Sequence, residues 1–303
     1  MTATAPTEDT NPVNAKLRAA LWMTGAITSF TTMAVAGRAV SLELDTFEIM
    51  LYRSLTGIVI VLAVAAWAGT LHQVGRQRIG LHLIRNICHF TGQNLWFYAI
   101  AAIPLAQVFA LEFTSPVWVI LLSPLLLREK LTGTGLIAAG LGFLGILIVA
   151  RPDPDNISIG LIAAASCAIF FALTAILTRK LTQTETITAI MVYLTVTQAA
   201  FGLICAGFDG DIALPSAAAV PWIILIGCAG LVAHFCLTTA LRLAPASIVM
   251  PIDFVRLPTI AVVGMLLYDE PLELAVFAGA ALIFLANYIN ISGGRLPRRQ
   301  EST

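Results

Sequence analysis

Four charged residues interrupt long apolar segments of the chain and are the first candidates for chemistry: Arg53, Glu112, Asp253 and Arg256. If these segments cross a membrane, each charge costs roughly 2.5–3.5 kcal/mol at the bilayer centre, so it should face a cavity or a partner. Asp253 and Arg256 are three residues apart on one helix face and can form an ion pair. Glu112 has no basic residue at that spacing. It is a candidate for a substrate contact or a proton carrier, with a structural hydrogen bond to a neighbouring helix as the alternative.

The apolar segment 80–101 carries a polar stripe at spacings of three and four residues, formed by His82, Arg85, Asn86, His89, Gln93 and then Trp96. Such spacing places these side chains on one face of a helix. We expect His82 and Arg85 to anchor at the cytoplasmic edge, with His89, Gln93 and Asn94 deeper. The deeper groups either line a water-filled cavity or form hydrogen bonds between helices.

Trp96, Phe97 and Tyr98 form an aromatic cluster at the outer end of the same segment. An interfacial belt explains such a cluster. A stacking surface for a planar substrate explains it equally well, since an aromatic pair gains about 0.5–1.5 kcal/mol beyond burial.

The elements that must position these residues are membrane helices, because 58% of the 303 residues are hydrophobic and only 11% are charged. A soluble domain carries roughly 25% charged residues. The net charge of zero gives no attraction to nucleic acid. The five cysteines fall in apolar stretches without a metal-like spacing, and we interpret them as packing residues. No zinc-protease, P-loop or dinucleotide motif occurs, so we expect no catalytic, metal or cofactor site and no direct use of ATP.

Apolar runs separated by Gly, Pro and charge predict an all-α integral membrane protein with ten spans. These are 17–37, 46–69, 80–101, 104–127, 131–150, 157–178, 186–208, 219–241, 245–268 and 272–292. Residues 1–16 and 293–303 are expected to be cytoplasmic tails, the first of them disordered. Thirteen of the 17 Lys and Arg fall in segments that share one side if the N-terminus is cytoplasmic. Because basic residues mark the cytoplasmic side, both termini are predicted inside.

Two repeats are predicted, residues 17–150 and residues 157–292, because a shift of 141 residues superimposes the first on residues 158–291 of the second without a gap. Under this shift Glu112 meets Asp253, Ser115 meets Arg256, and Gln93 meets His234. Each half has five helices, and because five is an odd number the second copy must insert in the opposite sense. This arrangement suits alternating access. The alternative is an accidental resemblance in a membrane enzyme or a scaffold.

Prolines occur in both the fourth and the ninth segment, at Pro116, Pro124, Pro251 and Pro258. Proline bends a helix and leaves backbone carbonyls free. Interrupted helices in corresponding halves are a sequence indicator of a transport site, and a kink needed only for packing is the alternative. We therefore predict a central cavity lined by the third, fourth, eighth and ninth spans.

Several short motifs occur between Arg85 and Pro152: Arg85, His89 and Gln93; Ile103-Pro104-Leu105-Ala106; Glu112-Phe113 with Pro116; and Arg128-Glu129-Lys130-Leu131 before a glycine-rich helix. The second half repeats the last of these as Asp269-Glu270-Pro271-Leu272. Together they resemble the EamA type of the drug/metabolite transporter superfamily, over residues 17–292. In the ninth segment Leu257 precedes Pro258, a departure from the first half.

The resemblance implies ten helices, a location in the bacterial inner membrane, and secondary transport of a small metabolite. The chain looks most like the branch with riboflavin and S-adenosylmethionine uptake carriers, and riboflavin is the expected substrate. Uptake of S-adenosylmethionine and export of amino acids or drugs remain alternatives, as does a membrane-embedded enzyme or scaffold. Lipid and the small substrate are the expected partners, and a homodimer is left open.

Overall fold

The computed structural model describes residues 12–127, 133–150, 158–208, 210–243, 252–253 and 255–293. Within these ranges every regular element is a helix, as expected of an all-α chain. Some expectations lie outside the described residues. They concern most of both tails, the loops around Arg128 and Arg151, and the ninth segment up to Pro251.

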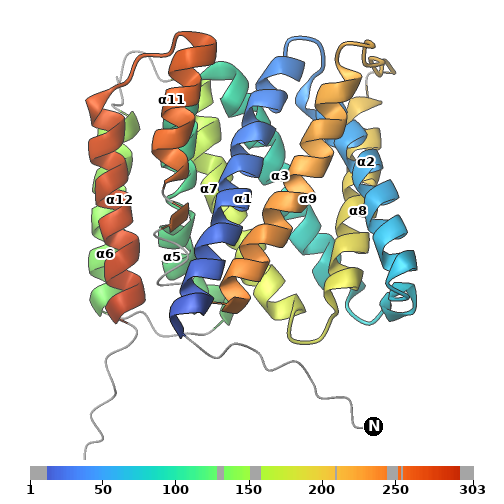
Figure 1. Ribbon diagram of the computed structural model, residues 1–303, viewed down its shortest axis with the longest axis horizontal. Coiled ribbons are helices and arrows are strands. Elements are labelled where there is room, and N and C mark those ends of the chain that lie inside the picture. Colours follow the sequence, from blue (N-terminus) through green and yellow to red (C-terminus); the bar gives the residue numbers. More distant parts are fainter. Residues whose placement is uncertain are drawn as a thin grey trace, which may run out of the picture.

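The helices stand side by side as one bundle with roughly aligned axes (Figure 1). Their bounds are α1 Pro12–Val40, α2 Thr46–Trp67, the short 3-10 helix Leu71–Gln73, α3 Ile79–Ala102, α4 Leu105–Glu112, α5 Ser115–Leu127, α6 Gly133–Ala150, α7 Ile159–Leu181, α8 Ile187–Ala206, α9 Val220–Leu243, α11 Arg256–Tyr268 and α12 Leu274–Gly293. α1 begins inside the stretch expected as a tail. Proline suits the first turn of a helix, and Ala15, Lys16 and Leu17 that follow are good helix formers.

Six helices in the described part of the chain are long and apolar enough to cross a membrane. They are Leu17–Val40, Thr46–Trp67, Leu105–Leu122, Ile159–Leu181, Ile187–Ala206 and Val220–Leu237. Large apolar side chains also point outward from the helices, where Val59 of α2 is 69% exposed and Ile204 of α8 is 66% exposed. An outer surface of this kind suits lipid rather than water.

Local sequence fixes the corner between α1 and α2. The Asp45 side chain accepts hydrogen bonds from the backbone N–H groups of Phe47 and Glu48, and the Glu48 carboxylate accepts one from Asp45 N. This capping box satisfies N–H groups that would otherwise lack partners at the start of α2. Glu48 also accepts a 2.6 Å hydrogen bond from Ala213 N, which ties the α8–α9 loop to the same corner.

The strongest packing is between pairs of helices far apart in the sequence. α1 packs along α9, α3 along α7, α2 along α8, and α6 along α12. Glycine allows the last pair to approach closely, since a Cβ on Gly145 would lie 2.8 Å from the backbone oxygen of Gly279. At Gly145, α6 and α12 therefore pack backbone against backbone.

The fourth apolar segment is interrupted at Phe113 and Thr114, between α4 and α5. The cause is Pro116, which has no N–H for the carbonyl of Glu112 and whose ring would clash with that carbonyl in a continuous helix. The Ser115 hydroxyl donates a 2.7 Å hydrogen bond to this carbonyl instead. The interruption expected from proline is therefore present, and its freed backbone group is satisfied by the neighbouring residue.

Candidate functional site

A cavity of about 40 Å³ lies between α2, α3, α8 and α9. Its walls are Met50, Arg53, Ser54, Gly57, His89, Met191, Leu194, Thr195, Gln198, Gly227, Gly230, Leu231 and His234. In the order of expected spans these are the second, third, seventh and eighth. The fourth and ninth spans, which were expected to line the cavity with the third and eighth, contribute no described wall residue.

Arg53 is the cation of this cavity. Its guanidinium donates to Gln93 Oε1, lies 3.6 Å from the sulfur of Met50, and stands 5.7 Å from the centre of the Phe97 ring. In the described part of the chain no carboxylate lies within ion-pair distance of Arg53. A charge without an anionic partner inside a helical bundle is a feature of substrate and ion pathways.

Two histidines complete the polar wall. His89 on α3 is 6% exposed, and its Nδ1 has no hydrogen-bond partner in the described structure. His234 on α9 is exposed, and its ring meets the edge of Phe30 at a centroid distance of 5.5 Å. Both rings can therefore donate to, or accept from, a molecule in the cavity.

A hydrogen-bonded network adjoins the cavity on the side of Gln198. Gln198 donates to the backbone oxygen of Asn86 at 2.9 Å, and Asn86 donates to Thr197 Oγ1 at 2.7 Å. Arg85 donates to Asn86 Oδ1 at 2.9 Å and to Thr178 Oγ1 at 3.0 Å. Arg85 is thus 8% exposed and held by neutral groups of α3 and α7, rather than anchored at a surface as expected.

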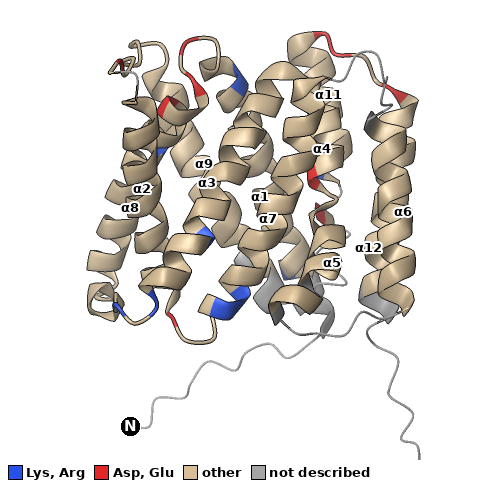
Figure 2. Ribbon diagram, turned by 180° about the vertical axis from the view of Figure 1, so that it is seen from behind, with Lys and Arg blue, Asp and Glu red and all other residues tan. Residues whose placement is uncertain are grey.

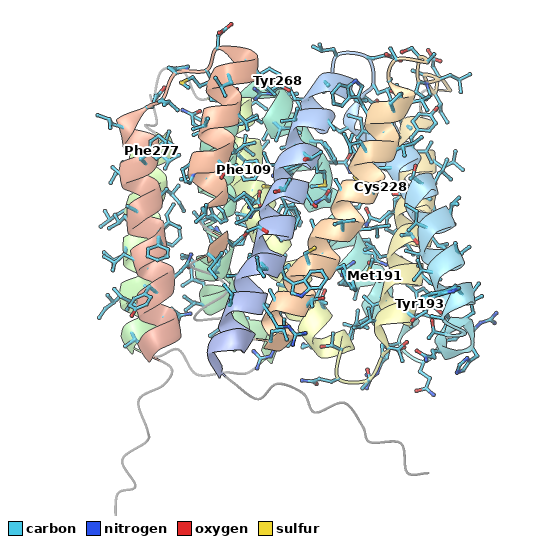
Figure 3. All side chains as sticks on the ribbon, viewed as in Figure 1. Phe109, Met191, Tyr193, Cys228, Tyr268 and Phe277 are labelled. Atoms are coloured by element: carbon cyan, nitrogen blue, oxygen red, sulfur yellow. The ribbon has the colours of Figure 1, made fainter. Side chains whose placement is uncertain are left out.

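His82, in the first turn of α3, is also buried, with only 2% of its surface exposed. Its ring stacks on Tyr193 at 4.3 Å, and its Nε2 lies 3.9 Å from a Glu185 oxygen. Tyr193 lies with Met191 on the lower half of α8 (Figure 3). His82 therefore joins α3 to α8 and to the loop before α8.

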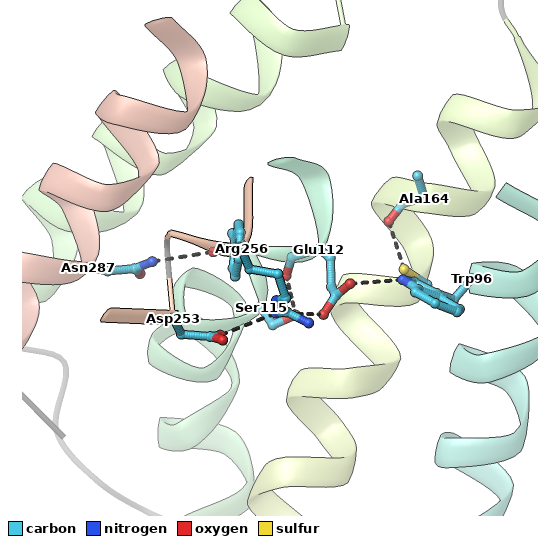
Figure 4. Close-up of polar contacts among 9 residues, drawn as sticks. Trp96, Glu112, Ser115, Ala164, Asp253, Arg256 and Asn287 are labelled. Atoms are coloured by element: carbon cyan, nitrogen blue, oxygen red, sulfur yellow. Dashed lines mark hydrogen bonds and ion pairs between the residues drawn. The ribbon is translucent and has the colours of Figure 1, made fainter. Parts of the chain in front are cut away.

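A second polar group lies at the break between α4 and α5 (Figure 4). Arg256 Nη2 is 3.2 Å from Glu112 Oε1 and 3.2 Å from Asp253 Oδ2. The indole N–H of Trp96 donates to Glu112 Oε2 at 2.8 Å. The expected pair of Asp253 and Arg256 is therefore present, and the same guanidinium also binds Glu112, 144 residues earlier in the chain.

Aromatic rings surround the guanidinium of Arg256. The ring centres of Phe30, Phe113 and Phe109 lie 4.7, 4.8 and 5.0 Å from its central carbon. Phe109 lies in the interior between α1 and α11 (Figure 3). On the far side of the break, Asn287 of α12 donates a 3.3 Å hydrogen bond to the carbonyl of Phe113. The break is thus held by side chains from α11 and α12.

The aromatic cluster of α3 divides between the interior and the surface. Trp96 is 2% exposed and Phe97 is fully buried, whereas Tyr98 is 42% exposed. Trp96 packs against Phe97 and Phe109, so it holds Glu112 rather than presenting a face to the cavity. Asn94 is buried and donates to the Phe90 carbonyl at 2.8 Å.

The structure thus distributes the sequence candidates over two places. Arg53, His89 and His234 are on the cavity wall, and Gln93 binds Arg53 beside it. Trp96, Glu112, Ser115, Asp253 and Arg256 meet at the helix break, and Asn94 and Tyr98 belong to neither group. Reasoning from sequence missed Thr195 and Gln198 of α8, although polar residues within an apolar span were the available signal.

A third group closes one end of the bundle. Arg38 at the end of α1 pairs with Glu270, and it also donates to the carbonyls of Ile100 and Ile103. Glu270 accepts a 2.9 Å hydrogen bond from Leu105 N. These contacts tie α1, the corner between α3 and α4, and the α11–α12 loop together.

Comparison with known proteins gives one family. The model of the "EamA-like transporter family" matches residues 17–151 and again residues 158–292. A "Riboflavin transporter" of Vibrio cholerae is 29% identical over 276 residues, which cover 89% of this chain and 91% of that protein. A "Riboflavin transporter" of Brucella anthropi is 32% identical over 212 residues, covering 69% of this chain and 75% of that protein.

More distant similarity extends to another substrate and to a solved structure. An "S-adenosylmethionine uptake transporter" of Rickettsia bellii is 20% identical over 265 residues, covering 88% of this chain and 90% of that protein. One protein crystal structure superimposes with a TM-score of 0.65 at 18% identity, covering 91% of this chain and 98% of that chain. This last likeness concerns the fold alone.

Proposed function

Because the chain belongs to the EamA-like transporter family, we propose that it carries riboflavin into the cell by alternating access, as a secondary transporter of the bacterial inner membrane. The proposed architecture has ten spans in two inverted five-helix repeats, with both termini in the cytoplasm. The observation that carries the substrate proposal is a cavity whose arginine has no acidic partner among the described residues.

Helix packing supports the inverted repeat. The shift of 141 residues makes α1 equivalent to α7 and α3 equivalent to α9. Exchange of the two halves therefore turns the α1–α9 contact into the α7–α3 contact. It leaves the α2–α8 and α6–α12 contacts unchanged. An arrangement that survives exchange of its halves suits a carrier that rocks around a central site.

Charge distribution supports the orientation. Figure 2 shows basic residues gathered at the end of the bundle where α1 begins, with acidic residues prominent at the other end. The α2–α3 and α7–α8 loops lie at the first of these ends (Figure 1). An excess of Lys and Arg on one side is typical of the cytoplasmic side.

The charge of Arg53 supports riboflavin over S-adenosylmethionine. S-adenosylmethionine carries a sulfonium and an ammonium cation beside one carboxylate, so its net charge is positive, and two like unit charges about 8 Å apart repel by roughly 2 kcal/mol at an effective dielectric constant of 20. Riboflavin has no cation, and its ring carbonyls and ribityl hydroxyls can accept hydrogen bonds from Arg53 and His89, while the partnerless Oε1 of Gln198 can accept one from a ribityl hydroxyl.

Counterflow into proteoliposomes tests the proposal. Vesicles that contain the purified full-length chain and unlabelled riboflavin should take up labelled riboflavin from outside, and a hundredfold excess of S-adenosylmethionine should leave this uptake unchanged. Empty vesicles are the control. Counterflow of labelled S-adenosylmethionine without counterflow of riboflavin would establish the alternative substrate, and absence of both would reject uptake of either.

A further inference from the structure

Glu112 and Asp253 share one guanidinium, and this arrangement has no evident part in holding a substrate in the cavity. Arg256 Nη2 stands 3.2 Å from an oxygen of each carboxylate. None of the three residues belongs to the cavity wall. The side chains of Glu112, Asp253 and Arg256 are only 16%, 7% and 5% exposed.

Counting charges shows an imbalance. Two ionised carboxylates and one guanidinium leave one negative charge inside the bundle, and within the described residues no second cation is paired with either acid. A buried unpaired charge is costly, and two neighbouring acids usually relieve it by sharing a proton. One proton on the pair would make the three residues neutral.

The hydrogen bonds show which acid has room for that proton. Both oxygens of Glu112 accept, Oε2 from the Trp96 indole and Oε1 from Arg256. Asp253 Oδ2 accepts from Arg256, but Asp253 Oδ1 is buried without any partner in the described structure. An ionised carboxylate normally has hydrogen-bond donors at both oxygens when it is buried.

The groups that face the two acids from neighbouring helices offer no other base at hydrogen-bond distance. Among the described residues, the titratable or charged ones are Arg256 of α11, Cys167 of α7 and His234 of α9. Cys167 is close enough to Glu112 to interact with it electrostatically, and His234 interacts in the same way with Arg256. The Cys167 thiol donates to the Ala164 carbonyl at 3.0 Å. α1, α3, α5 and α12 present Phe30, Trp96, Ser115 and Asn287.

We propose that Glu112 and Asp253 hold one exchangeable proton between them and couple substrate movement to the proton gradient. The step needs no other reactant: a carboxylate takes a proton from one side of the membrane and releases it on the other. Glu112 is the last residue of α4, in the first half of the chain. Arg256 is the first residue of α11, in the second half. Gain or loss of the proton therefore changes the strength of a link between the two halves.

This inference rests on the proposed function for its transport readout, so the experiment has one arm that needs no substrate. Infrared spectroscopy of the purified full-length chain at neutral pH should show the carbonyl band of a buried carboxylic acid. Asp253→Asn should remove that band, and Glu43→Gln, a change at an exposed carboxylate, should leave it. If wild-type protein has no such band, the proposal is wrong whatever the substrate.

The second arm measures coupling. With one proton moved per riboflavin, an inward gradient of one pH unit should concentrate riboflavin up to about tenfold in proteoliposomes. Glu112→Gln and Asp253→Asn should keep counterflow and lose this accumulation. Counterflow by the wild type without any accumulation would overturn coupling alone. Absence of counterflow would reject the riboflavin proposal, while the infrared band still decides whether the proton is held. Both decisive measurements use wild-type protein, so a variant that fails to fold does not prevent a decision.

Discussion

At the scale of single residues, Arg53 and Arg256 have opposite surroundings. Arg256 binds two carboxylates and stands among three aromatic rings. Arg53 has an amide, a sulfur atom and one ring. Burial of a cation costs least when acids compensate it, so Arg256 suits a link between helices. Arg53 keeps uncompensated charge for a visiting molecule.

Substitutions at Gln93 can test whether the charge of Arg53 serves substrate binding, because Gln93 Oε1 accepts a hydrogen bond from the Arg53 guanidinium. Gln93→Leu should lower the free energy of unfolding by about 1–3 kcal/mol, since it leaves a buried charged donor unpaired. Gln93→Glu should not lower stability, because an anion replaces a neutral acceptor. It should weaken riboflavin binding tenfold or more, roughly the value of one hydrogen bond to a charged group.

Thermal unfolding of the purified variants and quenching of riboflavin fluorescence measure the two effects separately. Asn94→Asp is the matched control, because Asn94 is the next residue of α3 but bonds to the Phe90 carbonyl instead of Arg53. It should destabilise the protein without the selective loss of binding. If Gln93→Glu binds riboflavin as tightly as the wild type, the charge of Arg53 has no part in the recognition of riboflavin.

At the scale of helices, the break between α4 and α5 has a local cause that can be tested by a double-mutant cycle. Ser115 donates to the Glu112 carbonyl that Pro116 leaves without an N–H. Ser115→Ala should cost about 0.5–1.5 kcal/mol. In a Pro116→Ala background, where residue 116 regains its N–H, the same change should cost less. Denaturant unfolding of the four proteins gives the coupling energy, and simple additivity would contradict this account of the break.

The contact of α6 with α12 gives a matched pair of glycine substitutions. A Cβ at Gly145 would stand 2.6 Å from Ile283 Cγ1 and 2.8 Å from the Gly279 oxygen, which is backbone and cannot rotate away. A Cβ at Gly140 on the same helix would meet nothing within 4 Å. Gly145→Ala should therefore destabilise the protein by about 1–3 kcal/mol through overpacking. Gly140→Ala should be neutral or stabilise it by up to about 1 kcal/mol, because alanine favours helix. Equal unfolding midpoints for the two variants would contradict the close approach of α6 and α12.

Helices and their interruption were predictable because their causes are local. The start of α2 at Thr46 follows from Asp45 and Glu48, and the break near Phe113 follows from Pro116. The pair of Asp253 and Arg256 was predictable for the same reason, since residues three apart share a helix face.

Contacts between distant segments were not predictable in this way. Spacing within one helix carries no information about which other helix packs against it. The bond of Arg256 to Glu112 and the hydrogen bond of Trp96 to the same acid both depend on that packing. So does the cavity: the expectation named α3 and α9 correctly, but it omitted α2 and α8, which pack together.

At the scale of the whole molecule, alternating access needs both ends of the bundle to open in turn, and the described structure has one end tied. Arg38, Glu270 and the carbonyls of Ile100 and Ile103 join three parts of the chain there. Glu270→Gln should weaken this tie and shift the carrier toward opening at that end. A cysteine at Ala102, which lines the hollow beside Arg38, should then react faster with a membrane-impermeant maleimide added outside. An unchanged rate would show that the pair does not limit opening.

Sidedness is the remaining property of the whole molecule, and four loop positions test it in the intact membrane. Leu42 lies in the α1–α2 loop and is 91% exposed, and Leu214 lies in the α8–α9 loop and is 84% exposed. Gln77 lies in the α2–α3 loop and Thr184 in the α7–α8 loop. These last two loops are at the opposite end of the bundle from the first two (Figure 1). Placed singly in a background without the five native cysteines, Leu42→Cys and Leu214→Cys should react with an impermeant maleimide in intact cells. Gln77→Cys and Thr184→Cys should react only after the membrane is permeabilised, because the proposed orientation places the basic loops in the cytoplasm. Each half contributes one position to each side. Labelling in the first half gives its direction of insertion, and labelling in the second half shows whether that half is inserted in the opposite direction. Labelling of Thr184→Cys in intact cells together with Leu42→Cys would contradict inverted insertion, even if every helix were in place.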